Sequence, residues 1–339
     1  MIFKNMTFFK TSFTDDKAPS QPEIEEALQQ IAFRRCLPSL LSSSGFFHPM
    51  APLSSIPDKI SEEDEENGVE VAEEGDNAIT HSIPQAVMFS VMTETKDIKK
   101  SELELRKVSR VKKQLGAEYK HTDPLVIKQM MLDCEEEIVA EMAKNAFSSF
   151  NKVDAIFDFK TDHLIISSTS NSVIENVKSL LSRVFNGNIH FVPAKPFVDL
   201  KRVMTLWIDD RTDNEPPNGF ILGGDCVLIE DGNKKSKVTC ANQNLSSDEI
   251  INHVADYNKV VTKVSLNFDD KFFLTLDEEF NFTKVSAGSK FLDEKDDADA
   301  ESLAELRDAE FSITMNYLRE ALETFYEYFR EMEESEGAS

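Results

Sequence analysis

Apolar and polar residues alternate with a period of two along several stretches of this chain, which is the pattern of a half-buried β-strand. The N-terminal "MIFKNMTFFKTSF" alternates in this way and lacks an uninterrupted apolar core before a small-residue cleavage site. It therefore predicts a first strand rather than a signal peptide. From Val153, "VDAIFDF" and "LIISS" flank a "KTDH" turn and predict a hairpin. Further strands are predicted at "IHFV", "CVLIED", "KSKVTC" and "KFFLTL".

Between these strands the apolar spacing changes to three and four residues, which predicts helices. Two successive helices are expected in the middle of the chain, from Lys96 to Leu115 and from about Thr122 to Phe147. Others are expected at Ser172–Phe185, at Leu200–Asp209 and, with an apolar stripe, from Leu303 to Phe329. Hairpins interleaved with helices predict an α+β fold of antiparallel sheets with flanking helices and a helical projection.

The charged residues are unevenly distributed along the chain, which has a formal net charge of −25. Acid is concentrated in "SEEDEENGVEVAEEGD" and in the C-terminal section from Asp293. The first middle helix instead carries cations at three- and four-residue steps, which form one basic stripe: Lys96, Lys99 or Lys100, Arg106 or Lys107, Arg110 and Lys113. A solvated helix face is the more frequent interpretation of such a stripe. Contact with nucleic acid is the alternative, and it gains weight because acid dominates elsewhere.

A second group of cations lies in "NLSSDEIINHVADYNKVVTKVSLNF", where a helix is expected to lead into a strand from Lys259. Strict alternation places Lys259 and Lys263 on one polar face of that strand, with hydroxyl and amide side chains after them. Lysines in register on a sheet are suited to contact phosphates. The alternative is an ordinary half-solvated sheet in which lysine discourages edge pairing.

Motifs of catalysis are missing from the sequence. It contains no G-x-x-x-x-G-K-[ST] loop, no G-x-S-x-G elbow and no H-E-x-x-H pair, and its six histidines are dispersed. The four cysteines form no C-x-x-C pair and are expected to be buried free thiols in a reducing compartment. We therefore expect no catalytic residues, no metal and no cofactor, and not an enzyme. No apolar run approaches the ~20 residues that span a bilayer, so a cytoplasmic protein without membrane partners is expected.

Several segments resemble the recombination-associated RdgC family, found in bacteria and in some phages. The segment "NLSSDEIINHVADYNKVVTKVSL" is similar to the family's most characteristic stretch. "FKNMTFF", "GFFHPM", "AITH", "AFSSF" and "NGFIL" occur in the family's order. The resemblance covers nearly the whole chain apart from an acidic insertion at 53–76.

The resemblance implies a homodimer closed into a ring with a basic hole that encircles duplex DNA. It also implies association with the nucleoid, binding of single- and double-stranded DNA with little sequence preference, and antagonism of the RecA-type recombinase. Lys259 falls on a lysine that lines the hole, and Phe147 on an aromatic residue of one dimer contact. Asn242 and Gln243 fall on a Lys-Gln pair at the other contact. Asn242 and Asn145 replace cationic residues of the family, and Lys144 beside Asn145 retains one positive charge.

The expected organisation is one RdgC-like unit over residues 1–339. Its parts are an α+β part at 1–90 that contains the insertion, a helical projection at 91–150, a central antiparallel part at 151–292 and an acidic C-terminal helix and tail at 293–339. The rival hypothesis is an acidic protein-binding regulator, or DNA mimic, that acts on recombination proteins and has little affinity for DNA itself.

Overall fold

The computed structural model of the protein describes residues 3–14, 18–56, 78–209, 211, 213–230, 233–255, 257–298 and 300–337. The chain forms two compact units. Unit 1 comprises Met1–Gln21, Ser82–Met88 and Asp154–Ser339, and unit 2 comprises Pro22–His81 and Phe89–Val153. Helices and antiparallel strands alternate throughout, so the predicted α+β fold is confirmed. Of the insertion predicted at 53–76, residues 57–76 lie outside the described residues.

A seven-stranded sheet has the order β2-β4-β5-β6-β1-β7, with β3 paired to β4. In unit 1, β1 (Thr7–Phe13) pairs antiparallel with both β6 (His163–Ile166) and β7 (Ile189–Pro193). The predicted hairpin is confirmed, since β6 also pairs antiparallel with the C-terminal part of β5 (Ser148–Asp158). The apolar stripe of α6 (Asn171–Val184) supplies buried side chains to this unit.

The second sheet of unit 1 has five antiparallel strands in the order β12-β11-β10-β8-β9. The strands are β8 (Phe220–Glu230), β9 (Asn233–Cys240), β10 (Lys259–Phe268), β11 (Phe272–Asp277) and β12 (Phe282–Ala287). The strand predictions for this region are confirmed, except that Asp231, the last residue of the predicted "CVLIED", lies outside the described residues with residue 232. β9 and β12 are the edge strands.

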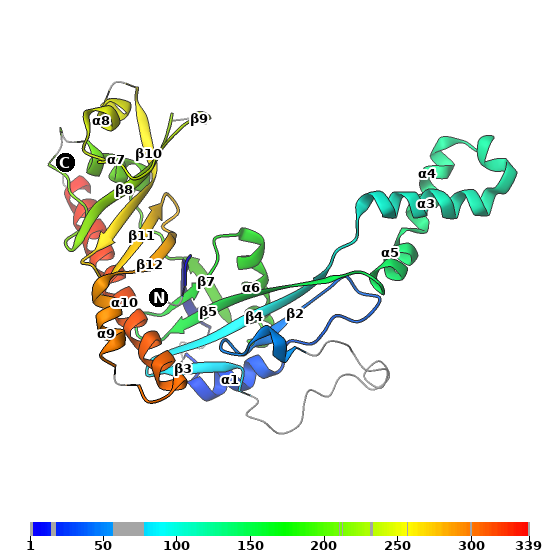
Figure 1. Cartoon of the computed structure of the whole chain (residues 1–339), viewed down its shortest axis with the longest axis horizontal. Helices are drawn as coiled ribbons and strands as arrows, with labels where there is room; N and C mark the ends of the chain where they lie inside the picture. Colours follow the sequence, from blue (N-terminus) through cyan, green and yellow to red (C-terminus); the bar gives the residue numbers. More distant parts are fainter. Residues whose placement is uncertain are drawn as a thin grey trace. The chain divides into compact units, whose positions relative to one another are not determined.

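Helices cover one face of this sheet. α10 (Leu303–Gly337) runs alongside it (Figure 1), and the Phe325 ring lies 4.3 Å from that of Phe220 on β8. α7 (Leu200–Ile208) packs against β10, as does α8 (Asp248–Ala255), and α9 (Ser289–Asp296) contacts β11. The indole Nε1–H of Trp207 on α7 donates to Tyr328 Oη on α10 at 2.9 Å. The predicted apolar stripe of the C-terminal helix therefore forms the core beneath the sheet.

Unit 2 contains β2 (Ser42–Phe47), which pairs antiparallel with β4 (Ala86–Lys96). The remaining short elements of this part of the chain are α1 (Gln21–Gln29), η1 (Leu53–Ser55) and β3 (Thr80–Ile83).

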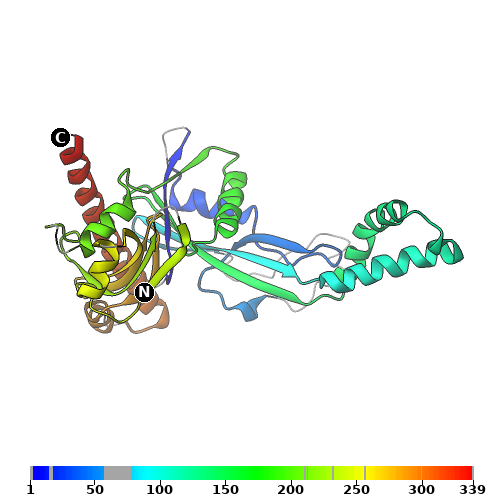
Figure 2. The same cartoon turned by 90° about the horizontal axis from the view of Figure 1, so that it is seen from above.

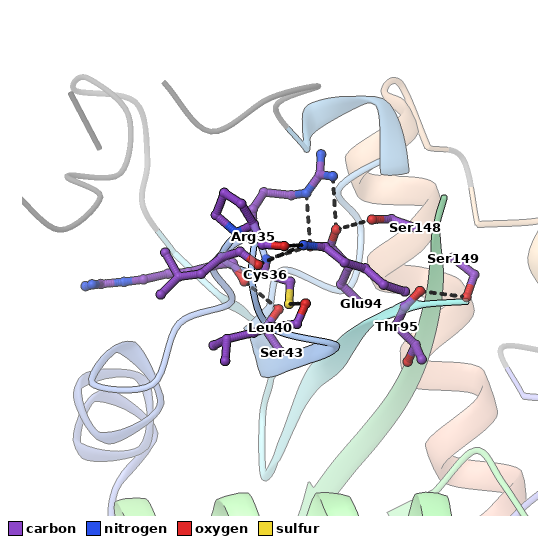
Figure 3. Close-up of polar contacts among 12 residues, drawn as sticks. Arg35, Cys36, Leu40, Ser43, Glu94, Thr95, Ser148 and Ser149 are labelled. Carbon is purple, nitrogen blue, oxygen red and sulfur yellow. Dashed lines mark hydrogen bonds and ion pairs between the residues drawn. The ribbon is translucent and has the colours of Figure 1, made fainter. Parts of the chain in front are cut away.

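A buried carboxylate lies at the centre of the unit 2 strands. Glu94 on β4 is 0% exposed, and Arg35 donates to it from both Nε and Nη2 at 3.0 Å. The Cys36 N–H donates at 2.7 Å, and the Ser148 hydroxyl completes the set (Figure 3). Burial alone would raise the pKa of Glu94, but these hydrogen bonds outweigh it and hold the pKa below its ordinary value.

The predicted helical projection is present in unit 2, where α3 (Lys100–Leu115), η2 (Gly116–Lys120), α4 (Pro124–Asp133) and α5 (Glu135–Ala143) lie together in both views (Figures 1 and 2). Its core consists of Val111, Cys134, Ile138 and Met142. Two boundaries differ from the prediction. The first helix begins at Lys100, because Lys96 is the last residue of β4, and the second is interrupted at Cys134.

Candidate nucleic-acid interface

The five-stranded sheet has a second face whose side chains reach the surface, and we call it the open face. Its side chains are mostly hydroxyl, amide and cationic groups, with a few apolar ones and two carboxylates. The members are Ile221, Asp225, Val227, Ile229, Lys237, Thr239, Val260, Lys263, Ser265, Asn267, Phe273, Thr275, Asp277, Thr283, Lys284 and Ser286. Lys, Ser, Thr and Asn side chains are common donors to the phosphates of DNA.

A β-bulge in β10 corrects the prediction that Lys259 and Lys263 share a face. Lys259 pairs with Glu230 of β8, whereas Lys263 pairs with Val227, three residues away. An odd separation along β8 means opposite faces. The register shift lies between Val261 and Lys263, so Thr262 is the extra residue that breaks the alternation.

The bulge has a local cause in the helix that covers the sheet. The Val261 N–H donates to the Thr205 hydroxyl of α7 at 2.9 Å, and the Thr262 hydroxyl donates to the Val227 carbonyl at 3.2 Å. These two side-chain bonds replace ladder hydrogen bonds that regular pairing would supply. Val261 and Val264 both remain in the core as a result, and Lys263 reaches the open face.

Lys259 lies on the helix-covered side of the sheet. Its ammonium donates to the Ser236 hydroxyl at 2.7 Å and to the Ser236 carbonyl at 3.3 Å. The side chain is half-buried at the start of β10, and its DNA contact stays a prediction of the resemblance.

Three lysines of the open face are exposed: Lys237, Lys263 and Lys284. Lys263 Nζ lies 3.9 Å from Asp277 Oδ2, and Lys284 Nζ lies 3.4 Å from Asp225 Oδ2. Both ammonium groups lie at the surface and both pairs are long, although Asp277 itself is buried, so a phosphate can approach either lysine. Asp277 keeps partners without the lysine, because the Glu279 and Asn281 N–H groups also donate to it.

An apolar pair lies at one end of the open face. Phe273 of β11 and Ile221 of β8 both lie directly opposite Asn267 of β10, and they are 43% and 60% exposed. A glycine pair in β8 separates Ile221 from the lysine end, at the register shift between Val264 and Leu266. A Cβ on Gly223 would collide with the Ser265 hydroxyl oxygen, so this irregular part of β8 favours glycine.

The basic stripe of α3 is largely neutralised within unit 2. Arg106 pairs with Glu102 at 2.7 Å, and Arg110 pairs with Glu137 and Glu141 of α5 at 3.3 and 2.7 Å. The hydrogen bond to Glu141 raises the pKa of Arg110. Lys107, the alternative to Arg106, is buried, and its hydrogen bonds to Glu104 and then Glu135 raise its pKa. An open cavity of about 660 Å³ nevertheless has Arg106, Arg110 and Lys113 in its wall.

The other predicted cations of unit 2 differ in availability. Lys96 is bound within the unit, because its ammonium donates to the Leu37 and Pro38 carbonyls at 2.7 and 2.8 Å. Lys100, Lys113 and Lys144 are exposed. The prediction that Lys96 belongs to a helical stripe is wrong, since a strand end fixes its position.

The residues predicted at dimer contacts lie at the surface. Phe147, immediately before β5, is 91% exposed. Asn242 and Gln243 are exposed in the loop after β9, which bonds back to β8. The Asn242 N–H donates to Asp225 Oδ1 and the Gln243 N–H to the Gly224 carbonyl, both at 3.0 Å. Asn242 adopts a left-handed φ of 53°, which asparagine tolerates better than most residues.

Sequence reasoning missed Lys237, Lys284 and Phe273 on the open face. Alternation in "KFFLTL" requires one of the two adjacent phenylalanines to point outward, which is a usable signal for Phe273. Lys284 had no such signal, because it lies at an irregularity of β12 with a φ of 52°.

Across the described ranges, no three His, Cys, Asp or Glu side chains come together as a group able to hold a metal ion. No helix within those ranges has the length and apolar character to cross a membrane.

Comparison with known proteins identifies the family of this chain. Residues 58–332 match the family model described as "Putative exonuclease, RdgC". The chain belongs to the RdgC family. The RdgC match begins at residue 58, extends into both units and includes β8 to β12 and the loop with Asn242 and Gln243.

Curated RdgC relatives align over nearly the full chain at low identity. The Recombination-associated protein RdgC of Sodalis glossinidius (strain morsitans) is 25% identical over 318 residues, which is 92% of this chain and 91% of that protein. The proteins of the same name from Serratia proteamaculans (strain 568) and Yersinia pestis (strain Pestoides F) are each 24% identical, covering 93% and 96% of both chains respectively. At this identity about three of every four aligned residues differ.

Proposed function

We propose that this RdgC-family chain binds DNA without sequence preference and acts in homologous recombination as a ring-shaped homodimer. The observation that carries the proposal is the open face of the five-stranded sheet, where exposed Lys237, Lys263 and Lys284 lie among hydroxyl and amide groups. The family membership and the relatives' name, Recombination-associated protein RdgC, support the assignment.

The physical basis of binding is phosphate neutralisation. Each lysine that displaces a counterion from DNA makes log K fall with log salt by about 0.9 for duplex. The open face has no base-reading helix or bidentate arginine, so little sequence discrimination is expected. The acid elsewhere on the chain would repel DNA and direct it toward this face.

Single strands have an additional contact. Phe273 and Ile221 lie exposed on the same face as the lysines, and an unpaired base can stack on an exposed aromatic ring for about 1–3 kcal/mol. In duplex DNA the bases are already stacked. We therefore expect Phe273 to contribute to single-strand binding only.

Dimerisation and the effect on recombination are part of the same proposal. Phe147 would form one contact between copies, and the Asn242–Gln243 loop the other. DNA enclosed by such a ring is withheld from a RecA-type recombinase, which would antagonise strand exchange and associate the protein with the nucleoid.

Fluorescence anisotropy with a generic duplex and a generic single strand, each at several salt concentrations, tests the proposal. Binding to both with a linear log–log salt dependence is expected. Absence of binding at low salt would overturn it. Parallel reactions with Mg²⁺ or Mn²⁺ also report on the nuclease activity that the family description names, and intact DNA is expected.

A second candidate function follows from the neutralised stripe. Arg106, Arg110 and Lys107 are already paired with glutamates, and the net charge is −25. An acidic surface of this kind favours binding to recombination proteins in place of DNA. Flow-through on heparin together with capture of purified RecA-type recombinase would support this candidate, and retention on heparin at low salt would support the first.

A further inference from the structure

We propose that Cys226 and Cys240 form a thiol–disulfide exchange site, whose partner is a small anionic disulfide of the glutathione type. The two residues lie directly opposite each other in the antiparallel β8–β9 pair, and both are buried free thiols. The chain's other cysteines, Cys36 and Cys134, belong to unit 2 and have no cysteine opposite them in the described strand pairs.

Direct pairing satisfies the geometry of a disulfide. Opposite residues of an antiparallel pair have Cα atoms about 4.5 or 5.5 Å apart. Both values lie inside the range of about 4.4–6.8 Å found for disulfides. Closing the bond between Cys226 and Cys240 therefore requires side-chain rotation rather than movement of a strand.

The route to the pair is local opening of β9, because β9 is an edge strand and edge strands open more readily than central ones. Cys226 and Cys240 alternate with Val227 and Thr239 of the open face, so their thiols point to the helix-covered side of the sheet. On the open face, a cavity of about 170 Å³ beside both residues is lined by Lys263 and Lys284. These two ammonium groups favour an anionic disulfide at this part of the sheet, although Asp225 in the same wall reduces the effect.

The order of the chemical steps follows from the environments of the two thiols. Burial, followed by the neighbouring Cys240, raises the pKa of Cys226 to about 12, so Cys226 is a poor first nucleophile. Cys240 is the last residue of β9 and is the first to react.

The exchange balances without a further reagent. The Cys240 thiolate attacks one sulfur of glutathione disulfide, which forms a mixed disulfide and releases one glutathione thiolate. Cys226 then loses its proton to solvent and attacks the Cys240 sulfur, which releases the second glutathione. The two cysteines lose two electrons and two protons, and glutathione disulfide is reduced to two thiols.

The product would fix the edge of the sheet. A Cys226–Cys240 bond joins β9 covalently to β8 at the base of the loop with Asn242 and Gln243. It would suppress local opening of β9. If that loop is a dimer contact, a point that rests on the proposed function, oxidation will also shift the monomer–dimer equilibrium.

The test uses the full chain in glutathione redox buffers of increasing oxidised fraction. Samples are quenched in acid, unfolded, alkylated and mapped by mass spectrometry. A cross-linked peptide pair containing Cys226 and Cys240 is expected, with alkylatable thiols falling from four to two and recovering after dithiothreitol. Slower amide hydrogen exchange in β9 of the oxidised protein is also expected.

Variants separate the two steps. Cys226→Ala should leave glutathione attached to Cys240, Cys240→Ala should leave Cys226 reduced, and Cys134→Ala should still form the cross-link. The proposal is overturned if Cys240 stays reduced in the wild type, or if its glutathione adduct persists without transfer to Cys226. Neither readout involves DNA, so failure here is distinguishable from failure of the proposed function.

Discussion

Lys263 lies directly opposite Asp277 in the β10–β11 pair, with 3.9 Å between its ammonium and the carboxylate. The long distance and the exposed ammonium leave Lys263 available to a phosphate, although Asp277 is buried, whereas the ammonium of Lys259 donates to Ser236. The two lysines therefore make a matched comparison, since they have the same charge and belong to one strand but lie on opposite faces.

Lys263→Ala is expected to weaken duplex binding and to reduce the slope of log K against log salt by about 0.9, because one phosphate contact is lost. Lys284→Ala should do the same, and the double variant should lose about twice as much. Lys259→Ala separates two expectations, because its position on the helix-covered side predicts an unchanged slope whereas the resemblance implies a reduced one. Fluorescence anisotropy at several salt concentrations measures all four proteins. A larger effect at Lys259 than at Lys263 would show that DNA contacts the other side of β10.

Phe273→Ala is expected to weaken single-strand binding by roughly 5- to 150-fold, the equivalent of losing one stacked base. Duplex binding by the same variant should stay unchanged and serves as the internal control. Competition between labelled single strand and unlabelled duplex measures both. Equal loss for the two forms of DNA would contradict a stacking role for this ring.

Phe147→Ala is expected to weaken the dimer and raise the monomer fraction at low protein concentration, because a side chain that is 91% exposed in one chain is buried only by a partner, while the Asn242–Gln243 contact remains. Light scattering after size exclusion, at several protein concentrations, measures the mass. Phe197→Ala is a matched control, since Phe197 is 98% exposed and has no predicted contact. A monomeric wild type, or loss of the dimer in both variants, would argue against the assignment.

Glu94→Gln is expected to destabilise unit 2 by about 3 kcal/mol at neutral pH, because it leaves the Arg35 charge without its buried partner (Figure 3). Urea unfolding followed by far-UV circular dichroism measures the change. Fluorescence of Trp207, the single tryptophan, reports unit 1 and should be unaffected.

The stability difference between wild type and Glu94→Gln should also depend on pH. The pKa of Glu94 is lowered in the fold, so the unfolded chain holds the proton more tightly. The ion pair stabilises the fold above the ordinary pKa of 4.5, and this contribution is lost as the pH falls through the lower folded pKa. Wild type and Glu94→Gln should therefore converge in acid. A difference that persists there would mean that lost packing, rather than lost charge, is responsible.

Much of the fold follows from local periodicity, and the parts that do not follow depend on distant partners. The β5–β6 hairpin and the helix from Leu303 were predictable, because each is encoded within its own segment. The neutralisation of Arg110 was not, since its partner Glu141 is 31 residues away on another helix. Likewise, nothing within "NKVVTKVSL" indicates the bulge, because Thr205 of α7 and Val227 of β8 stabilise it.

The bulge at Thr262 is a phase shift in the direction of side chains along β10. A homologous strand can align without a gap from Lys259 to Lys263. Its two lysines can still point to the same side of the sheet, if that strand has no bulge against its neighbour. An aligned position therefore predicts which side chain is present, but it does not predict to which face of the sheet that side chain points. Deleting the uncharged Thr262 would remove the bulge, yet it would leave both lysines where they are, because Val261 and Lys263 already lie opposite the consecutive residues Leu228 and Val227. The side of the sheet that each positive charge occupies is therefore set by pairing with β8, and neither the spacing in the sequence nor the net charge of −25 reports it.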